Sequence, residues 1–191
     1  MNRLPKILLS AAVVLGCALA GYFGVQRYFH PAPVPVVLGE WRARQLAGLA
    51  LEAPGEFQGK PLHFGEAQEL IASSEMQVFT TPGFEIAVLR TVYKDGVELS
   101  FDSAAEGAVA GIAQLPGIRN LQQTTVELTV SGKPARRVSV AAERWRKALR
   151  AELLFIADGQ RYFQVQATFD AANPHGAADA GRLLQSVRLA P

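Results

Sequence analysis

The chain has 191 residues, of which 49 % are hydrophobic and 19 % are charged, a balance typical of a folded protein. Its 19 basic and 17 acidic side chains give a net charge of +2, which excludes the strongly basic footprint of a dedicated nucleic-acid-binding protein. The positive balance belongs to residues 1–30, so residues 31–191 carry a formal charge of −1. Composition therefore predicts a globular domain and no nucleic-acid partner.

Residues 1–6 form a short basic start, and residues 7–25 then run for 19 positions without a charge. A helix of that length spans about 28 Å, close to the roughly 30 Å hydrocarbon core of a membrane. Because Arg3, Lys6 and the amino terminus outnumber Arg27 across this stretch, the positive-inside rule places the following chain outside the cytoplasm. We predict a single-pass anchor in the inner membrane and a periplasmic C-terminal domain.

Two other interpretations of residues 7–25 stay open. Ala18 to Ala20 form an A-x-A pattern, so cleavage after Ala20 would release a secreted domain. Cys17, the only cysteine, lies in a loose lipid-attachment pattern, although the chain after it stays apolar. All three interpretations export the domain, and all three leave it without a disulfide.

Small residues recur at every fourth position of the apolar segment, and on a helix they would share one face that a second helix can approach closely. A homodimer through this face is one interpretation, and an ordinary Ala- and Gly-rich export segment is the other. Residues 26–38 then form a linker whose alternate prolines favour an extended polyproline II backbone before the exported domain, residues 39–191. The small-residue face consists of Ala12, Gly16, Ala20 and Gly24.

Apolar and polar residues alternate in the second half of the domain, as they do in strands with one buried face. Val126, Leu128 and Val130 show this pattern most clearly, and glycine-containing turns at 131–134 and 158–160 lie before and after two further strands that Arg144 to Ala148 join. We predict a four-stranded antiparallel meander. Its strands cover residues 125–130, 135–143, 149–157 and 162–169.

Earlier in the domain, a strand over 84–92 leads into the turn Lys94 to Gly96, and a second strand over 97–101 returns. Ser103 followed by Glu106 fits a capping box at the start of a helix that ends at Pro116-Gly117. The remaining predicted elements are weaker strands near 46–52 and 76–80, a short helix at 66–73 and a final helix that opens near Asn173-Pro174.

Strands grouped between helices, without β-α-β alternation, favour the α+β class. We predict an antiparallel sheet covered by helices, an α/β/α sandwich, preceded by one N-terminal transmembrane helix. The segments that carry a family resemblance are Pro82 to Ile86 entering a hairpin, the capped helix at 103–115, Leu115 to Ile118, the turn Ser131 to Arg136 and Leu183 to Val187 in the closing helix.

These segments, in this order, resemble the PsbP-like superfamily of α/β/α sandwiches, which also includes a Ran-binding nuclear import factor. The resemblance covers about residues 75–190 and includes no catalytic motif. It implies a non-enzymatic module that binds or assembles other proteins. No binding residue is transferred with it.

The sequence has no phosphate-binding loop, dinucleotide-binding fingerprint, zinc-protease motif or hydrolase nucleophile elbow. A Ser/His/acid site built from Ser103, His175 and either Asp102 or Asp170 is conceivable, but helix-start and strand-end roles explain these residues as well. The histidines are too scattered to predict a metal site. They are His30, His63 and His175. We expect no catalytic residue, metal or cofactor.

The most distinctive exposed feature is a cluster of six cations around one tryptophan, offset by Glu143 alone. The strand assignment places Arg144 to Lys147 at a hairpin tip. Cations beside an indole suit anionic headgroups or an acidic protein surface, and a solvated loop with Trp145 folded onto the sheet is the alternative. The cluster consists of Arg136, Arg137, Arg144, Trp145, Arg146, Lys147 and Arg150.

The export segment and the cation cluster together predict a membrane-anchored periplasmic module that binds or assembles and does not catalyse. Its expected partner is a protein not identified by the sequence, or an anionic membrane surface. The first alternative is a secreted protein that binds a small ligand in a pocket between sheet and helix. The second is an enzyme whose site the sequence does not reveal.

Overall fold

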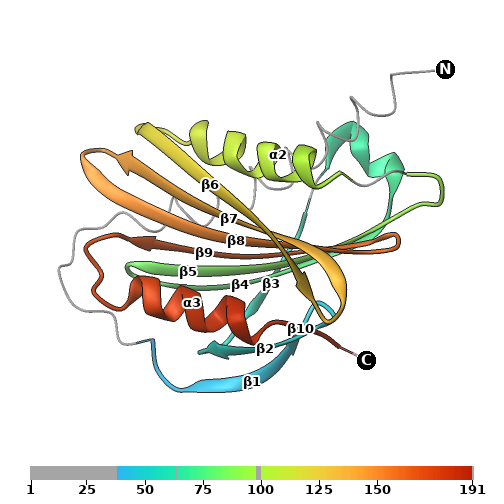
Figure 1. The fold of residues 1–191 in the computed structure, drawn as a ribbon, viewed down its shortest axis with the longest axis horizontal. Helices are drawn as coiled ribbons and strands as arrows, with labels where there is room; N and C mark the ends of the chain where they lie inside the picture. Colours follow the sequence, from blue (N-terminus) through green and yellow to red (C-terminus); the bar gives the residue numbers. More distant parts are fainter. Residues whose placement is uncertain (1–37, 63, 98–99, 191) are drawn as a thin grey trace.

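The computed structural model describes residues 38–62, 64–97 and 100–190. It contains β1 (Trp41–Leu46), β2 (Leu49–Pro54), β3 (Gln58–Lys60), η1 (Gly65–Leu70), β4 (Ile71–Thr81), β5 (Phe84–Tyr93), α2 (Phe101–Ala113), β6 (Ile118–Val130), β7 (Lys133–Arg144), β8 (Lys147–Asp158), β9 (Arg161–Asp170), α3 (Gly176–Ser186) and β10 (Arg188–Leu189). Seven strands form the central antiparallel sheet in the order β3-β4-β5-β9-β8-β7-β6. Helix α2 lies on one face of this sheet, and α3 lies on the other (Figure 1).

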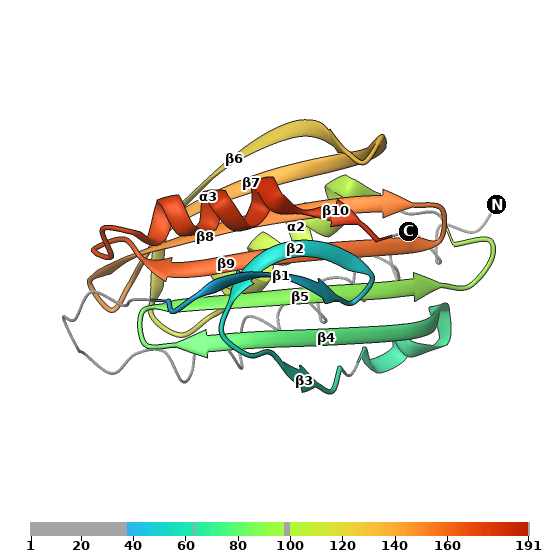
Figure 2. The ribbon, with the colours of Figure 1, turned by 90° about the horizontal axis from the view of Figure 1, so that it is seen from below.

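The face that carries α3 also carries a second, three-stranded sheet in the order β1-β2-β10 (Figure 2). Its core joins apolar side chains of β5 and β9, such as Phe84 and Phe163, to Leu49 of the small sheet and Leu183 of α3. The opposite face buries Phe155 and its neighbours under α2. Most of the residues that α2 buries are alanine and glycine, so the helix packs closely on the sheet.

The structure confirms the predicted meander: β6, β7, β8 and β9 pair antiparallel in sequence order. Strand β6 is longer than its alternating stretch and begins at Ile118, with a register shift between Arg119 and Gln122. The alternating pattern did not predict residues 118–124 as strand, because a bulge changes which side chains share a face.

The predicted sandwich of helices around a sheet, preceded by a transmembrane helix, is wrong. Strands account for 58 % of the structure and helices for 18 %, and on one face α3 shares the covering role with a three-stranded sheet. No helix in the described part of the chain is both long and apolar enough to cross a membrane. The segment predicted to do so, residues 7–25, lies outside the described residues, as do the linker prolines and the small-residue face.

The predicted hairpin that returns over 97–101 is also wrong. Strand β5 pairs with β9 and β4, and after the Lys94 to Gly96 turn the chain enters α2 at Phe101. The helix is capped by Ser100, whose side chain accepts a hydrogen bond from the backbone N–H of Ser103 at 3.3 Å. Ser100 and Ser103 lie three positions apart, about one helical turn, and both suit the cap, so the prediction placed it one turn too late.

Candidate functional site

The sheet divides the predicted cation cluster between its two faces. Arg136 points to the α2 face, where it pairs with Asp102 and with Glu127, the latter at 2.9 Å, and its side chain is 13 % exposed. The hydrogen bond to Asp102 raises the pKa of Arg136, more than burial lowers it. Arg137 points the other way and pairs with Glu152 at 2.9 Å. Both residues are engaged with acidic neighbours, which argues against the predicted role in binding.

Arg144 is buried, with 1 % of its surface exposed, and so it is not a surface cation as predicted. Its Nε donates a hydrogen bond to the carbonyl oxygen of Pro116 at 3.1 Å. Its guanidinium stacks on the ring of Trp145 at 4.2 Å from the centroid. Burial lowers the pKa of Arg144 to about 10, so the guanidinium that stacks on the indole stays charged at neutral pH.

The tip of the β7–β8 hairpin is where the sequence places it, between Arg144 and Lys147. Trp145 and Arg146 form its two-residue turn, with left-handed φ angles of 47° and 67°. Such turns favour Asn-Gly or another glycine pair, because a side chain in this conformation costs about 1 kcal/mol or more per residue.

Two other hairpin turns in the described chain have the same pair of left-handed residues. Both use glycine at the second position: Ala47-Gly48 between β1 and β2, and Ser131-Gly132 between β6 and β7. The Trp145-Arg146 turn does without a glycine, so the tip keeps a conformation that its sequence disfavours. Backbone strain of this kind is concentrated at functional sites, and here it presents a tryptophan that is 56 % exposed.

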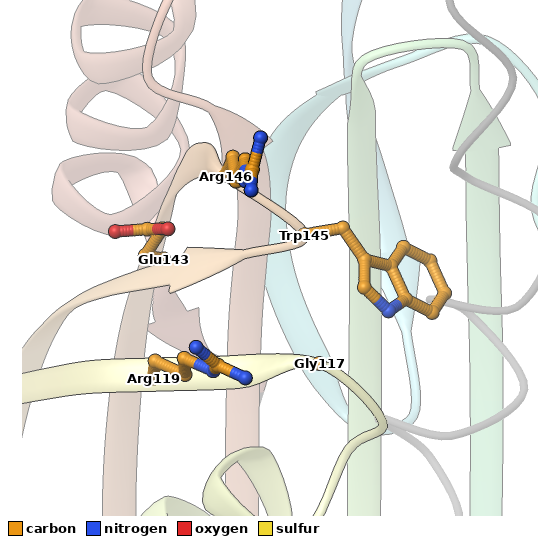
Figure 3. Close-up of a pocket in the computed structure, with 5 residues that line it drawn as sticks. All are labelled: Gly117, Arg119, Glu143, Trp145 and Arg146. Atoms are coloured by element: carbon orange, nitrogen blue, oxygen red, sulfur yellow. The ribbon is translucent and has the colours of Figure 1, made fainter.

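A hollow of about 330 Å³ lies beside this tip (Figure 3). Its lining comes from the turn, from the end of β7 and from the start of β6, where Arg119 pairs in register with Glu143. Figure 3 shows the side chains of Arg119 and Arg146 on either side of Glu143. The lining residues are Gly117, Arg119, Glu143, Trp145 and Arg146.

The cations around the tip differ from most others in the described chain because they have no acidic partner there. Arg42, Arg90, Lys133, Arg136, Arg137, Arg161 and Arg182 all form ion pairs. No described acidic residue forms an ion pair with the four cations at the tip, and the carboxylate of Glu143 accepts a hydrogen bond from Asn120 instead. These four cations are Arg119, Arg146, Lys147 and Arg150. We call them, with Trp145, the tip surface.

Arg119 and Gly117 were not predicted as site residues, because Pro116-Gly117 in a sequence signals the end of a helix. Pairing of β6 with β7 brings both residues to the tip, and nothing local in the sequence signals a contact with residues more than twenty positions away. The backbone N–H of Trp145 donates to the carbonyl oxygen of Gly117 at 3.2 Å, so the turn is held directly against the start of β6.

Gly117 leaves room for the indole, and we expect Gly117→Ala to displace it. A Cβ at this position would lie 2.2 Å from Nε1 of Trp145, closer than any packing allows. Gly132→Ala is the matched control: Gly117 and Gly132 have φ of +81° and +75°, but a Cβ at Gly132 meets no atom of the described chain within 4 Å. We expect Gly117→Ala to change Trp145 fluorescence and to lower the free energy of unfolding by about 1 kcal/mol more than the control does. Equal effects of the two variants would contradict this packing.

A buried polar row lies on the α2 face of the sheet and was not predicted. Glu85 is 3 % exposed and lies opposite Thr168, and its Oε2 has no hydrogen-bond partner in the described chain. Burial raises the pKa of this carboxyl group to about 8, although a hydrogen bond with Thr80 opposes the shift. The carboxyl group is therefore mostly neutral at pH 7. A single acid inside the apolar stretch Phe84 to Ile86 is the signal that could have found it.

The row continues along β9 through side-chain amides. Nε2 of Gln164 donates to Oε1 of Gln166 at 3.2 Å, and Nε2 of Gln166 donates to the hydroxyl of Thr168 at 3.0 Å. These hydrogen bonds satisfy polar groups that burial would otherwise destabilise. The row is a feature of the core, without the exposed charge of the tip surface.

The residues considered for a Ser/His/acid site are not brought together. Ser103 and Asp102 lie in the first turn of α2, and His175 precedes α3 on the other face of the sheet. Asp170 accepts a hydrogen bond from the backbone of Ala172 at 2.9 Å. Among the described residues, no three His, Cys, Asp or Glu side chains gather where they could hold a metal ion, and His30 and His63 lie outside that part.

No protein-family model and no curated protein matches this sequence. Among solved structures, PA94 of Pseudomonas aeruginosa, a protein of unknown function, is similar at a TM-score of 0.46 and 18 % identity, over 80 % of this chain and 99 % of PA94. LpqN of Mycobacterium tuberculosis, which is involved in cell envelope biogenesis, has a TM-score of 0.42 and 14 % identity, over 72 % of this chain and 93 % of LpqN. Similarities this low assign no function, and the resemblance to the PsbP-like superfamily stays a prediction.

Proposed function

We propose that this protein is a non-enzymatic binding module of the cell envelope that docks on an anionic membrane surface through the tip surface. The observation that carries the proposal is an exposed tryptophan on a strained turn, with four cations on the turn and on the adjoining parts of β6 and β8 that pair with no described acid. An indole is apolar with a single N–H donor, so it favours the boundary between headgroups and acyl chains. Cations beside it favour anionic lipids.

The expected strength of this docking follows from the same residues. Each Lys or Arg near an anionic surface contributes about 1 kcal/mol, so four of them contribute about 4 kcal/mol at most. This attraction falls with salt, because the Debye length shrinks from about 10 Å at 0.1 M to about 3 Å at 1 M. The tip surface therefore suits weak, reversible docking.

The proposed location rests on the sequence, whose basic start and apolar residues 7–25 suit export. The involvement of LpqN in cell envelope biogenesis is compatible with this location, but its TM-score gives it no weight. The absence of a recognisable catalytic motif supports a binding role over an enzymatic one. An exported module with a membrane-facing tip would meet lipid headgroups directly.

The proposal is tested with the full chain and vesicles that contain lipids brominated on their acyl chains. The chain has two tryptophans, so Trp41→Phe leaves Trp145 as the only one, and excitation at a wavelength that tyrosine does not absorb reports on it alone. We expect bromine to quench Trp145 in vesicles with 30 % phosphatidylglycerol, and not in vesicles of phosphatidylcholine alone. High salt should reverse the quenching.

The matched variants of this experiment remove two cations from different places. The double variant Arg146→Ser with Lys147→Ser should need at least ten times more lipid for half-maximal quenching, since about 2 kcal/mol of attraction is lost. Lys60→Ser with Lys94→Ser removes the same charge far from the tip and should leave quenching unchanged. Equal loss in both double variants, or equal quenching in neutral vesicles, would exclude docking through the tip.

A further inference from the structure

The two edges of the central sheet are very different. Strand β3, at one edge, has three residues, whereas β6, at the other, has 13 and is exposed along most of its length. A long edge strand presents unpaired backbone N–H and C=O groups to any other strand, and proteins usually protect such edges. Short strands are one form of protection, and β3 is an example.

Strand β6 carries little of the usual protection. It contains no proline and no lysine, and between the bulge and its last residue its only charge is Glu127. The bulge lies near its start, between Arg119 and Gln122, and includes Asn120 with φ of 54°. From Gln122 to Val130 the strand pairs regularly with β7, so nine consecutive residues offer an outer edge without a bulge.

Two apolar side chains on this strand are exposed to an unusual degree. Val126 is 60 % exposed and Leu128 is 38 % exposed. They pair in register with Arg137 and Ala135, which places them on the face of the sheet opposite α2. Among the described residues, Trp145 is the only other large hydrophobic residue that is exposed.

We propose that β6 pairs antiparallel with β6 of a second copy of this chain, so that the two central sheets become continuous. The regular stretch from Gln122 to Val130 has its midpoint at Val126, so a two-fold axis there uses the whole stretch in both copies. Val126 then lies opposite itself, and Leu128 lies opposite Thr124. Glu127 faces Thr125, and no like charges oppose each other.

This register explains why a second copy fits the edge better than an unrelated peptide. It covers both exposed apolar side chains in each copy against β-branched partners, the kind of cross-strand pair that stabilises sheets. An isologous contact of this kind also closes on itself, so it produces a dimer and no fibre. The inference does not depend on the tip surface, although a dimer would carry two tips and bind a membrane with greater avidity.

The register is tested by cysteine cross-linking of the full chain in a Cys17→Ser background, which removes the only native cysteine. We expect Val126→Cys to form a covalent dimer rapidly under mild oxidation. Leu128→Cys alone should not cross-link, but a mixture of Leu128→Cys with Thr124→Cys should. Lys60→Cys, exposed on the opposite edge strand, is the control for random collision.

Sedimentation of the full chain in mild detergent provides the second measurement. Val126→Lys places two cations face to face at the axis and should convert the dimer to a monomer without changing the circular dichroism spectrum. A dimer that survives this change would overturn the proposal and favour contact through Ala12, Gly16, Ala20 and Gly24 instead. A monomeric parent chain, or cross-linking of Val126→Cys no faster than that of Lys60→Cys, would also overturn it.

Discussion

Replacing Glu85 with glutamine should raise the free energy of unfolding at pH 8 by several kcal/mol. The carboxyl group of Glu85 has a pKa raised from 4.5 to about 8 by burial, so between these values the folded chain keeps a proton that the unfolded chain has lost. Stability therefore falls as the pH rises from about 4.5 to about 8, and is greatest below this window. A shift of this size corresponds to about 5 kcal/mol.

Glutamine has nearly the same shape and cannot ionise, so Glu85→Gln should remove this part of the pH dependence. The measurement is urea unfolding of both proteins at intervals from pH 4 to pH 9. Glu106→Gln, on the exposed side of α2, removes one carboxyl group without touching the core and serves as the control. If Glu85→Gln and the parent chain show the same slope of stability against pH, Glu85 does not carry a buried proton.

The turn variant Trp145→Asn with Arg146→Gly should make the protein more stable. Asn-Gly suits two consecutive left-handed residues, whereas each of the native residues costs about 1 kcal/mol or more in this conformation. The variant loses the contacts of the indole with Gly117 and with the Arg144 guanidinium. We therefore expect a net gain of about 1 kcal/mol in the free energy of unfolding.

Urea unfolding of the turn variant measures this gain. The control is Ser131→Asn, in a turn that already has glycine at its second position, Gly132. It also loses the hydrogen bond that the Ser131 hydroxyl accepts from the backbone N–H of Leu189 at 3.1 Å, so it should not gain stability. A turn variant less stable than the parent chain would mean that the indole contacts outweigh the strain. The tip would then be an ordinary structural turn.

Much of the sheet could be predicted because alternation is local. Apolar and polar residues alternate in the meander from β6 to β9, with turn residues between strands, and both signals lie in the sequence itself. The alternation did not predict burial, because β6 leaves Val126 and Leu128 exposed and β9 is buried on both faces. The turn at Ala47-Gly48 was missed because alanine rarely adopts φ of 50°, so a single strand over 46–52 looked continuous. The strand expected at 97–101 is wrong because a run of three apolar residues is too short to distinguish a strand from the chain that leads into a helix, and α2 begins at Phe101.

The site was predicted in part for the same reason. The hairpin tip follows from strand boundaries, which placed Trp145, Arg146 and Lys147 correctly. The prediction of a single cation surface was wrong because successive side chains of a strand point to opposite faces, so Arg136 and Arg137 lie on opposite sides of the sheet. The acids that neutralise them are 34 and 15 positions away, and only the paired strands and α2 bring them close.

We propose that the strained turn is kept because it binds a surface and not because it stabilises the fold. The most direct test is vesicle flotation of the full chain with the Trp145→Asn and Arg146→Gly turn, at 30 % phosphatidylglycerol and low salt, against phosphatidylcholine alone. We predict that this variant loses the extra binding to anionic vesicles shown by the parent chain, while its stability rises. Anionic binding that stays at the parent level in the more stable variant would contradict the claim.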